Sequence, residues 1–151
     1  MQAELPKFND LGLLPAGIHP CTLAQLRAVF GYNTRREYLL ERLDQCIALM
    51  KTHRLQGILH VDGSFVTDKD HPADIEVTLD VCRQPTRMQD QALVFYMRQY
   101  TALDKMGVDW WPTLPDNQNF INYFQYAGEK TAAIKRCDPK EPKGIIRLTR
   151  W

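Results

Sequence analysis

The sequence of 151 residues has little excess charge, no closely spaced cysteines and no long apolar run. Its 19 Lys and Arg against 18 Asp and Glu leave a net charge of +1. This balance excludes a histone-like protein, which binds nucleic acid through a strong positive excess. No apolar run approaches the roughly 18 residues of a membrane-spanning helix. The N-terminus lacks a basic segment followed by an apolar stretch, so we expect no signal peptide.

The four cysteines, at positions 21, 46, 82 and 137, form no C-x-x-C pair that would indicate zinc or redox chemistry. Without an export signal, we expect them to be reduced thiols of a cytoplasmic protein. The length suits one compact domain over residues 1–151.

Prolines and glycines divide the chain into elements. The first 20 residues hold three prolines and several apolar side chains, which predicts an irregular arm packed on the domain. We expect helices over 23–30, 34–54 and 88–105. Thr22 can cap the first helix, and Thr34 and Glu37 have capping-box spacing at the start of the second. The third carries the apolar residues Leu93, Met97, Tyr100 and Leu103. We expect strands over 58–61, 75–79, 107–111 and 145–148. Residues 117–126 read as a short helix or irregular apolar segment, and 128–142 as polar and flexible. This order predicts an α/β (α+β) fold.

The most informative stretch is a Gly63-Ser64 turn after a predicted strand, followed by Asp74 and Glu76 on the next strand. Alternation along a strand places these two carboxylates on one face. Neighbouring carboxylates repel unless a cation lies between them, and Mg²⁺ prefers such oxygen ligands together with substrate phosphates. The turn offers backbone N–H groups and the Ser64 hydroxyl to phosphate oxygens. A solvated strand face is the alternative for the two acids.

A third carboxylate, Asp109, lies in an otherwise apolar strand. An unpaired buried carboxylate is costly, so a metal ion shared with Asp74 and Glu76 is one explanation for it. A salt bridge to Arg147 or Lys143 is the other. His60 fits a packed, hydrogen-bonded histidine better than a ligand. His71, in the loop near the proposed site, is expected to be exposed, although it could touch phosphate.

Residues near the C-terminus are basic. Residues 129–151 carry seven basic and three acidic side chains, a net charge of +4, which leaves −3 of the total of +1 for residues 1–128. Such a segment could hold triphosphate, RNA or an acidic partner, or it could be a solvated face. Lys130 and Lys143 are the residues to test.

Of the neighbours Trp110 and Trp111, which could stack on a base, at least one is expected in the core because adjacent strand residues face opposite ways.

The pattern of Gly-Ser, a loop, Asp74-hydrophobic-Glu76-hydrophobic and a later strand carboxylate resembles the polymerase-β-like nucleotidyltransferase superfamily, in particular its minimal bacterial members. The resemblance implies a small mixed sheet packed with helices. It implies that Gly63 and Ser64 contact a nucleoside triphosphate, that Asp74 and Glu76 bind magnesium, and that Asp109 binds the catalytic metal and helps to activate the incoming hydroxyl.

Two positions depart from the superfamily pattern. Glu76 replaces the commoner Asp, and no arginine follows Gly63-Ser64, so Lys69 is the candidate for the positive charge on the triphosphate. The resemblance implies magnesium-dependent transfer of AMP from ATP to a hydroxyl of a protein or RNA, as an antitoxin or defence partner of another protein. The alternative is a binding module with the same fold and weak catalysis, which neutralises a toxin or binds nucleic acid.

Overall fold

The computed structural model describes residues 4–117 and 125–151. Within these ranges lie five strands: β1 (Ile18–Cys21), β2 (Ile58–Asp62), β3 (Ile75–Asp80), β4 (Val108–Thr113) and β5 (Ile145–Leu148). The described helices are α1 (Leu23–Phe30), α2 (Thr34–Thr52), α3 (Thr86–Lys105) and α5 (Gly128–Lys135), with short 3-10 helices η1 (Ser64–Val66) and η2 (Pro115–Asn117).

The strands form one sheet in the order β1-β5-β2-β3-β4. β5 and β2 pair antiparallel, as do β2 and β3, whereas β1 runs parallel to β5 and β4 parallel to β3. A mixed sheet packed with helices is the predicted fold class, and the structure confirms it.

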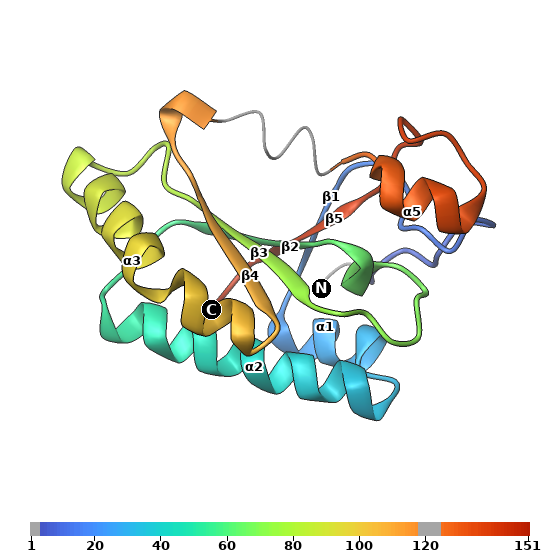
Figure 1. Cartoon of the computed structure of the whole chain (residues 1–151), viewed down its shortest axis with the longest axis horizontal. Helices are drawn as coiled ribbons and strands as arrows, with labels where there is room; N and C mark the ends of the chain where they lie inside the picture. The colour runs from blue at the N-terminus through green and yellow to red at the C-terminus, as the bar shows by residue number, and fades with distance from the viewer. Residues whose placement is uncertain (1–3, 118–124) are drawn as a thin grey trace.

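The two faces of the sheet have different coverings. Figure 1 shows α1 and α2 along one side of the sheet and α5 on the other. Trp110 points from β4 to the first side, where its ring packs on Phe95 of α3 with centroids 4.7 Å apart, and its Nε1 donates to Met50 Sδ of α2 at 3.2 Å. The core therefore lies between the sheet and helices α1, α2 and α3.

The N-terminal arm is not irregular throughout, so this part of the prediction is wrong. Its last residues form β1, which extends the sheet at one edge by pairing with β5. Pro20 lies inside this strand, and an edge strand tolerates proline because one side of it needs no ladder hydrogen bonds. The preceding residues are irregular as expected, and Leu13 and Leu14 are fully buried.

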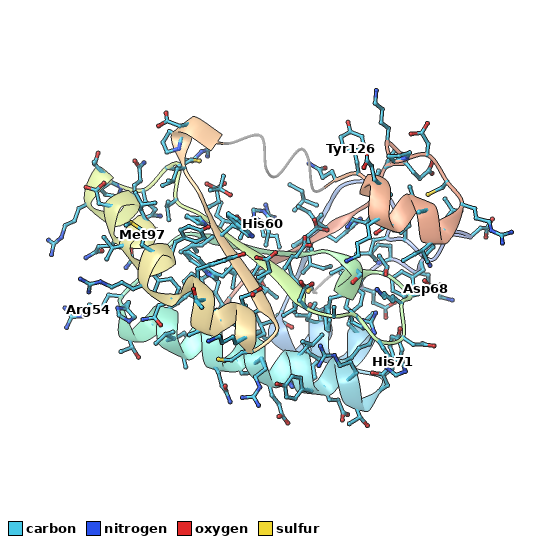
Figure 2. The ribbon with its side chains drawn as sticks, viewed as in Figure 1. Arg54, His60, Asp68, His71, Met97 and Tyr126 are labelled. Carbon is cyan, nitrogen blue, oxygen red and sulfur yellow. The ribbon has the colours of Figure 1, made fainter. Side chains whose placement is uncertain are left out.

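Of the four apolar positions noted for α3 in the sequence, only Leu103 is buried. Leu93 and Met97 are 41% and 74% exposed, whereas Ala92, Phe95 and Leu103 are buried. Helical periodicity allows either face to be the inner one, and the contact of Phe95 with Trp110 decides between them. In Figure 2, Met97 projects from α3 away from the sheet.

Three local details complete the comparison with the sequence. Asn33, not Thr34, caps α2, since its side chain accepts from the Arg36 N–H. The segment expected to be polar and flexible contains α5. Most of the apolar segment expected over 117–126 lies outside the described residues.

Candidate active site

Three carboxylates lie in one row across the face of the sheet opposite to α1 and α2. Asp62 at the end of β2 aligns with Glu76 of β3, and Glu76 aligns with Asp109 of β4. Aligned residues on neighbouring strands, about 4.8 Å apart, project to the same face. Asp74 stands two residues before Glu76, at the entrance to β3. The fold thus places all three predicted carboxylates on one surface, with Asp62 added.

Gly63 makes the turn that follows this row. Its φ of +81° is in the region that favours glycine, and a Cβ built there would lie 2.9 Å from Glu76 Cδ. Glycine is therefore required both by the backbone and by the approach of the Glu76 side chain. Ser64 then opens η1, in which the Val66 and Thr67 amides donate to the Gly63 and Ser64 carbonyls.

Asp62 and Lys143 form a buried ion pair, with Lys143 Nζ 2.8 Å from Asp62 Oδ1 and each side chain 4% exposed. Sequence reasoning missed the role of Asp62, although a charge at the end of an apolar strand was a sign of it. The sequence suggested Lys143 as a partner of Asp109, or as part of a basic segment that holds triphosphate, RNA or an acidic partner or is simply solvated. The structure instead brings Lys143 from the C-terminal segment to one end of the acidic row.

Asp109 lies at the other end of the row and forms neither of the two salt bridges considered for it. Its Oδ1 accepts from Trp111 Nε1 at 2.7 Å. Arg147 lies on β5, which β2 and β3 separate from the strand of Asp109, and it aligns with His60. Trp111 packs against Tyr96 and Tyr100 of α3, with ring centroids 5.2 and 5.3 Å away. As expected, one tryptophan of the pair, Trp110, belongs to the core.

Burial and mutual repulsion raise the pKa values of the acids in this row. Burial, then the neighbouring Asp62, raises the pKa of Glu76 to about 7, with Lys143 acting in the opposite direction. Burial raises the pKa of Asp74, which Lys130, Lys69 and Arg35 counteract. Burial also raises the pKa values of Asp62 and Asp109. Such a set of acids favours binding of protons or of another cation.

A cavity of about 1000 Å³ lies between the acidic row and the C-terminal segment. Asp62, Gly63, Ser64, Asp74 and Glu76 line it on the sheet side, with Lys69 from the loop after η1. Lysines line it on the opposite side, namely Lys130, Lys135, Lys140 and Lys143. Asp109 is not among the lining residues. Five of the six predicted site residues thus share one cavity, and the sixth, Asp109, aligns with Glu76 on the neighbouring strand.

The lysines differ in how far they are neutralised. Lys143 pairs with Asp62, and Lys135 of α5 pairs with Asp68 of the loop after η1. Figure 2 labels Asp68 on the part of this loop that lies near α5. Lys69, Lys130 and Lys140 form no ion pair with any residue that the structure describes. These three charges therefore remain available to an anion in the cavity.

Neither histidine near the motif contributes to this cavity. His71 is exposed on the loop, on the side away from α5 (Figure 2). His60 is buried on the acidic face of β2, and its Nδ1 has no hydrogen-bond partner among the described residues. Burial lowers the pKa of His60. The expectation that His60 packs is confirmed, whereas hydrogen bonding of its Nδ1 is not observed.

Over residues 4–117 and 125–151, no three His, Cys, Asp or Glu side chains are gathered closely enough to hold a metal ion on their own. The acids are adjacent in register yet are not drawn together around a single point.

All four cysteines are free thiols. No helix in the described part of the chain is long and apolar enough to cross a membrane.

A second cavity, of about 540 Å³, lies between the end of α2 and α3. His53, Arg87 and Arg98 line it, with Asp90 as its one carboxylate. It holds no pair of acids and no glycine turn, so the larger cavity is the candidate active site.

The fold and this cavity define a small α+β domain with an acidic sheet face opposed by lysines. A family model, described as a family of unknown function (DUF6932), matches residues 6–149, and the chain belongs to this family. Searches of curated proteins and of solved structures each found no match.

Proposed function

We propose that this chain is a magnesium-dependent nucleotidyltransferase that transfers AMP from ATP to a hydroxyl of a protein or RNA acceptor. The observation that carries the proposal is the row of Asp62, Glu76 and Asp109, with Asp74 beside it, facing lysines across one cavity. An acidic surface next to a basic one suits a ligand that itself combines a divalent cation with phosphates. The cavity is large enough for a nucleotide, since small-molecule sites have volumes of about 300–1,000 Å³.

The polyphosphate would lie on the basic side of the cavity. Lys69 and Lys130 line the same cavity as Asp74, and their positive charges oppose the burial that raises the pKa of Asp74. The Ser64 hydroxyl, at the start of η1, can donate to a phosphate oxygen, and Gly63 leaves room for this approach. Gly63, Ser64 and Lys69 would thus make the triphosphate contacts that the resemblance implies for them, and Lys130 would add a further positive charge.

Asp74, Glu76 and Asp109 would hold magnesium, which supplies charge stabilisation at the phosphate undergoing attack. Mg²⁺ typically uses only one or two protein carboxylates and completes its coordination with water and substrate phosphates. Acids that are close but not gathered are therefore compatible with a metal that arrives with the nucleotide. In the transfer, the acceptor oxygen bonds to the α-phosphorus, pyrophosphate departs, and the acceptor proton passes to a nearby base such as Asp109.

The test is transfer of label from ATP. The chain is incubated with Mg²⁺ and ATP labelled in the α-phosphate, alone and with the product of the neighbouring gene. We expect wild type to incorporate label and Asp74→Asn to incorporate at least about a hundredfold less. Asp90→Asn, the same substitution at an exposed position of α3, should incorporate as much label as wild type. Transfer that survives Asp74→Asn would contradict the site. Transfer of γ-label instead of α-label would contradict the reaction.

A binding module is the second candidate, and one observation favours it. No ready-made metal group exists among the described side chains, so the acidic and basic surfaces could serve to hold a toxin partner or nucleic acid without chemistry. Calorimetry with Mg²⁺ and a non-hydrolysable ATP analogue separates the candidates. Magnesium-dependent nucleotide binding supports the enzyme, and its absence with retained partner binding supports the module.

A further inference from the structure

Arg36 is a fully buried arginine in the first turn of α2. Its guanidinium donates to the backbone carbonyl oxygens of Phe30 at 3.3 Å, Phe65 at 2.6 Å, Thr67 at 2.7 Å, and Lys69 at 2.6 and 3.1 Å. Three of these four carbonyls, those of Phe65, Thr67 and Lys69, belong to the segment of residues 64–74, which comprises η1 and the loop that leads to β3. Hydrogen bonds from a charged donor are stronger than those between neutral groups, so the segment is firmly attached to α2.

The positive charge of Arg36 has no carboxylate within ion-pair distance among the described residues. Its guanidinium instead lies between two rings, 4.6 Å from the centroid of Tyr32 and 5.0 Å from that of Phe65. Burying a charge is costly unless all of its donors are satisfied, and only the planar fork of arginine can reach several carbonyls at once. Lysine could not replace it at this position.

The residues just before Arg36 hold further carbonyls of the same segment. Asn33 Nδ2 donates to Asp70 O at 2.7 Å, and Arg35 donates to Pro72 O at 3.0 Å and to Ala73 O at 2.5 Å. The Tyr32 hydroxyl adds longer contacts of 3.3 and 3.4 Å to the carbonyls of 68 and 69. Residues 32–36 thus bind the segment along most of its length.

This segment connects the two halves of the candidate site. Ser64 lies at its start, Lys69 in its middle and Asp74 at its end, and all three line the cavity. Between η1 and β3 it forms no helix or strand, although Thr67 forms an isolated bridge with Leu13 and the Asp68 N–H donates to Gly12 O, both in the N-terminal arm. The side chains of residues 32–36 supply the other attachments, and Arg36 supplies more of them than any other described side chain.

We infer that Arg36 is a positioning residue: it holds the Ser64–Asp74 segment so that Ser64, Lys69 and Asp74 meet in one cavity. The inference rests on the proposed function for what the cavity binds, whereas the attachment of the segment to α2 does not depend on it. Arg36 touches neither nucleotide nor metal in this assignment and acts only through the backbone of the segment.

The test compares Arg36→Lys with two controls on the same helix. Arg42→Lys makes the same chemical change where the guanidinium contacts Gln45 and the Tyr38 ring, without a hydrogen bond to the segment. Leu43→Ala removes a fully buried core side chain and lowers stability without removing such a bond. Each variant is measured at a temperature at which circular dichroism shows it fully folded.

Two readouts are taken: the affinity for Mg²⁺ with a non-hydrolysable ATP analogue, and hydrogen exchange of the amides of residues 64–74. We expect Arg36→Lys to weaken binding about tenfold or more and to accelerate exchange, because small misplacements of site groups are costly. Both controls should match wild type in both readouts.

Each other outcome has a defined meaning. If Arg36→Lys matches Arg42→Lys in both readouts, or if Leu43→Ala reproduces its effects, the inference is overturned. If wild type binds no Mg²⁺-nucleotide but Arg36→Lys alone accelerates exchange of the segment, the positioning role stands and the proposed function fails.

Discussion

The two faces of the sheet differ in what their side chains do. On the face toward α1, α2 and α3, strand residues such as Val61, Val77 and Trp110 are buried among other apolar groups. On the opposite face, the residues next to them in sequence are Asp62, Glu76 and Asp109. The same three strands thus carry an apolar row and an acidic row, one residue out of phase.

This difference shows where the fold gains stability and where it loses it. Apolar burial contributes about 25 cal/mol per Å², so the helix-covered face stabilises the domain. Partly buried acids with raised pKa values destabilise it near neutral pH, because their charged forms are poorly solvated. Groups retained at such a cost are candidates for function.

Trp110→Ala tests the apolar face. Trp110 is the largest fully buried side chain of the described core, and its loss leaves a cavity beside Phe95 and Met50. We expect the free energy of unfolding in urea to fall by about 3–5 kcal/mol at every pH. A loss below about 1 kcal/mol would show that this face is not the main source of stability.

Lys143→Met tests the acidic face. Removal of one partner of a buried ion pair typically costs about 3–5 kcal/mol, because the other charge remains unpaired. We expect a smaller loss at pH 5 than at pH 8, since the raised pKa of Asp62 lets the carboxyl protonate in acid. The double variant Asp62→Asn with Lys143→Met should recover much of the stability. An equal loss at both pH values would argue against this account.

Gly63→Ala tests the contact between the turn and the acidic row. The added Cβ would meet Glu76 Cδ, and the alanine would also have to adopt a positive φ. We expect the free energy of unfolding to fall by about 1–3 kcal/mol. Gly17→Ala is the matched control, because Gly17 has a φ of +120° but no atom within 4 Å of the added Cβ. Thermal unfolding should show the larger loss for Gly63→Ala, and equal losses would contradict the crowding.

Glu76→Gln tests the pH dependence of the acidic row. A carboxyl whose pKa rises on folding binds its proton more tightly in the folded state, so its stabilisation is complete below pH 4.5 and is lost as pH rises toward 7. The wild type should therefore lose on the order of 1–2 kcal/mol more than Glu76→Gln between pH 5 and pH 8. Urea titrations at both pH values measure this difference, and parallel curves would argue against the raised pKa.

Much of the framework was predictable from local sequence. Helix α1 has the predicted bounds, with Thr22 as its cap, because the capping interaction involves only Thr22 and Gln25 within one turn. The strand alternation around Glu76 is seen in the structure, where Ile75 and Val77 on either side of it are buried in the core. The paired acids on one face were predictable for the same reason, since strand periodicity is a local property.

Other features could not be predicted because they depend on partners far away in the sequence. β1 exists by pairing with β5 near the opposite end of the chain, and its sequence, with Pro20, has no strand pattern of its own. The face that α3 buries depends on which side of the helix meets Trp110.

The sequence alone determined the glycine turn, the spacing of Asp74 and Glu76 and the basic character of the C-terminal segment, because these are properties of neighbouring residues. Only the tertiary structure decided that Asp62 joins the acidic row, that Lys143 pairs with Asp62, and that Arg36 holds the connecting segment. Each of these is a contact between groups distant in the chain, formed when strand register and helix packing bring buried charges to the partners that can satisfy them.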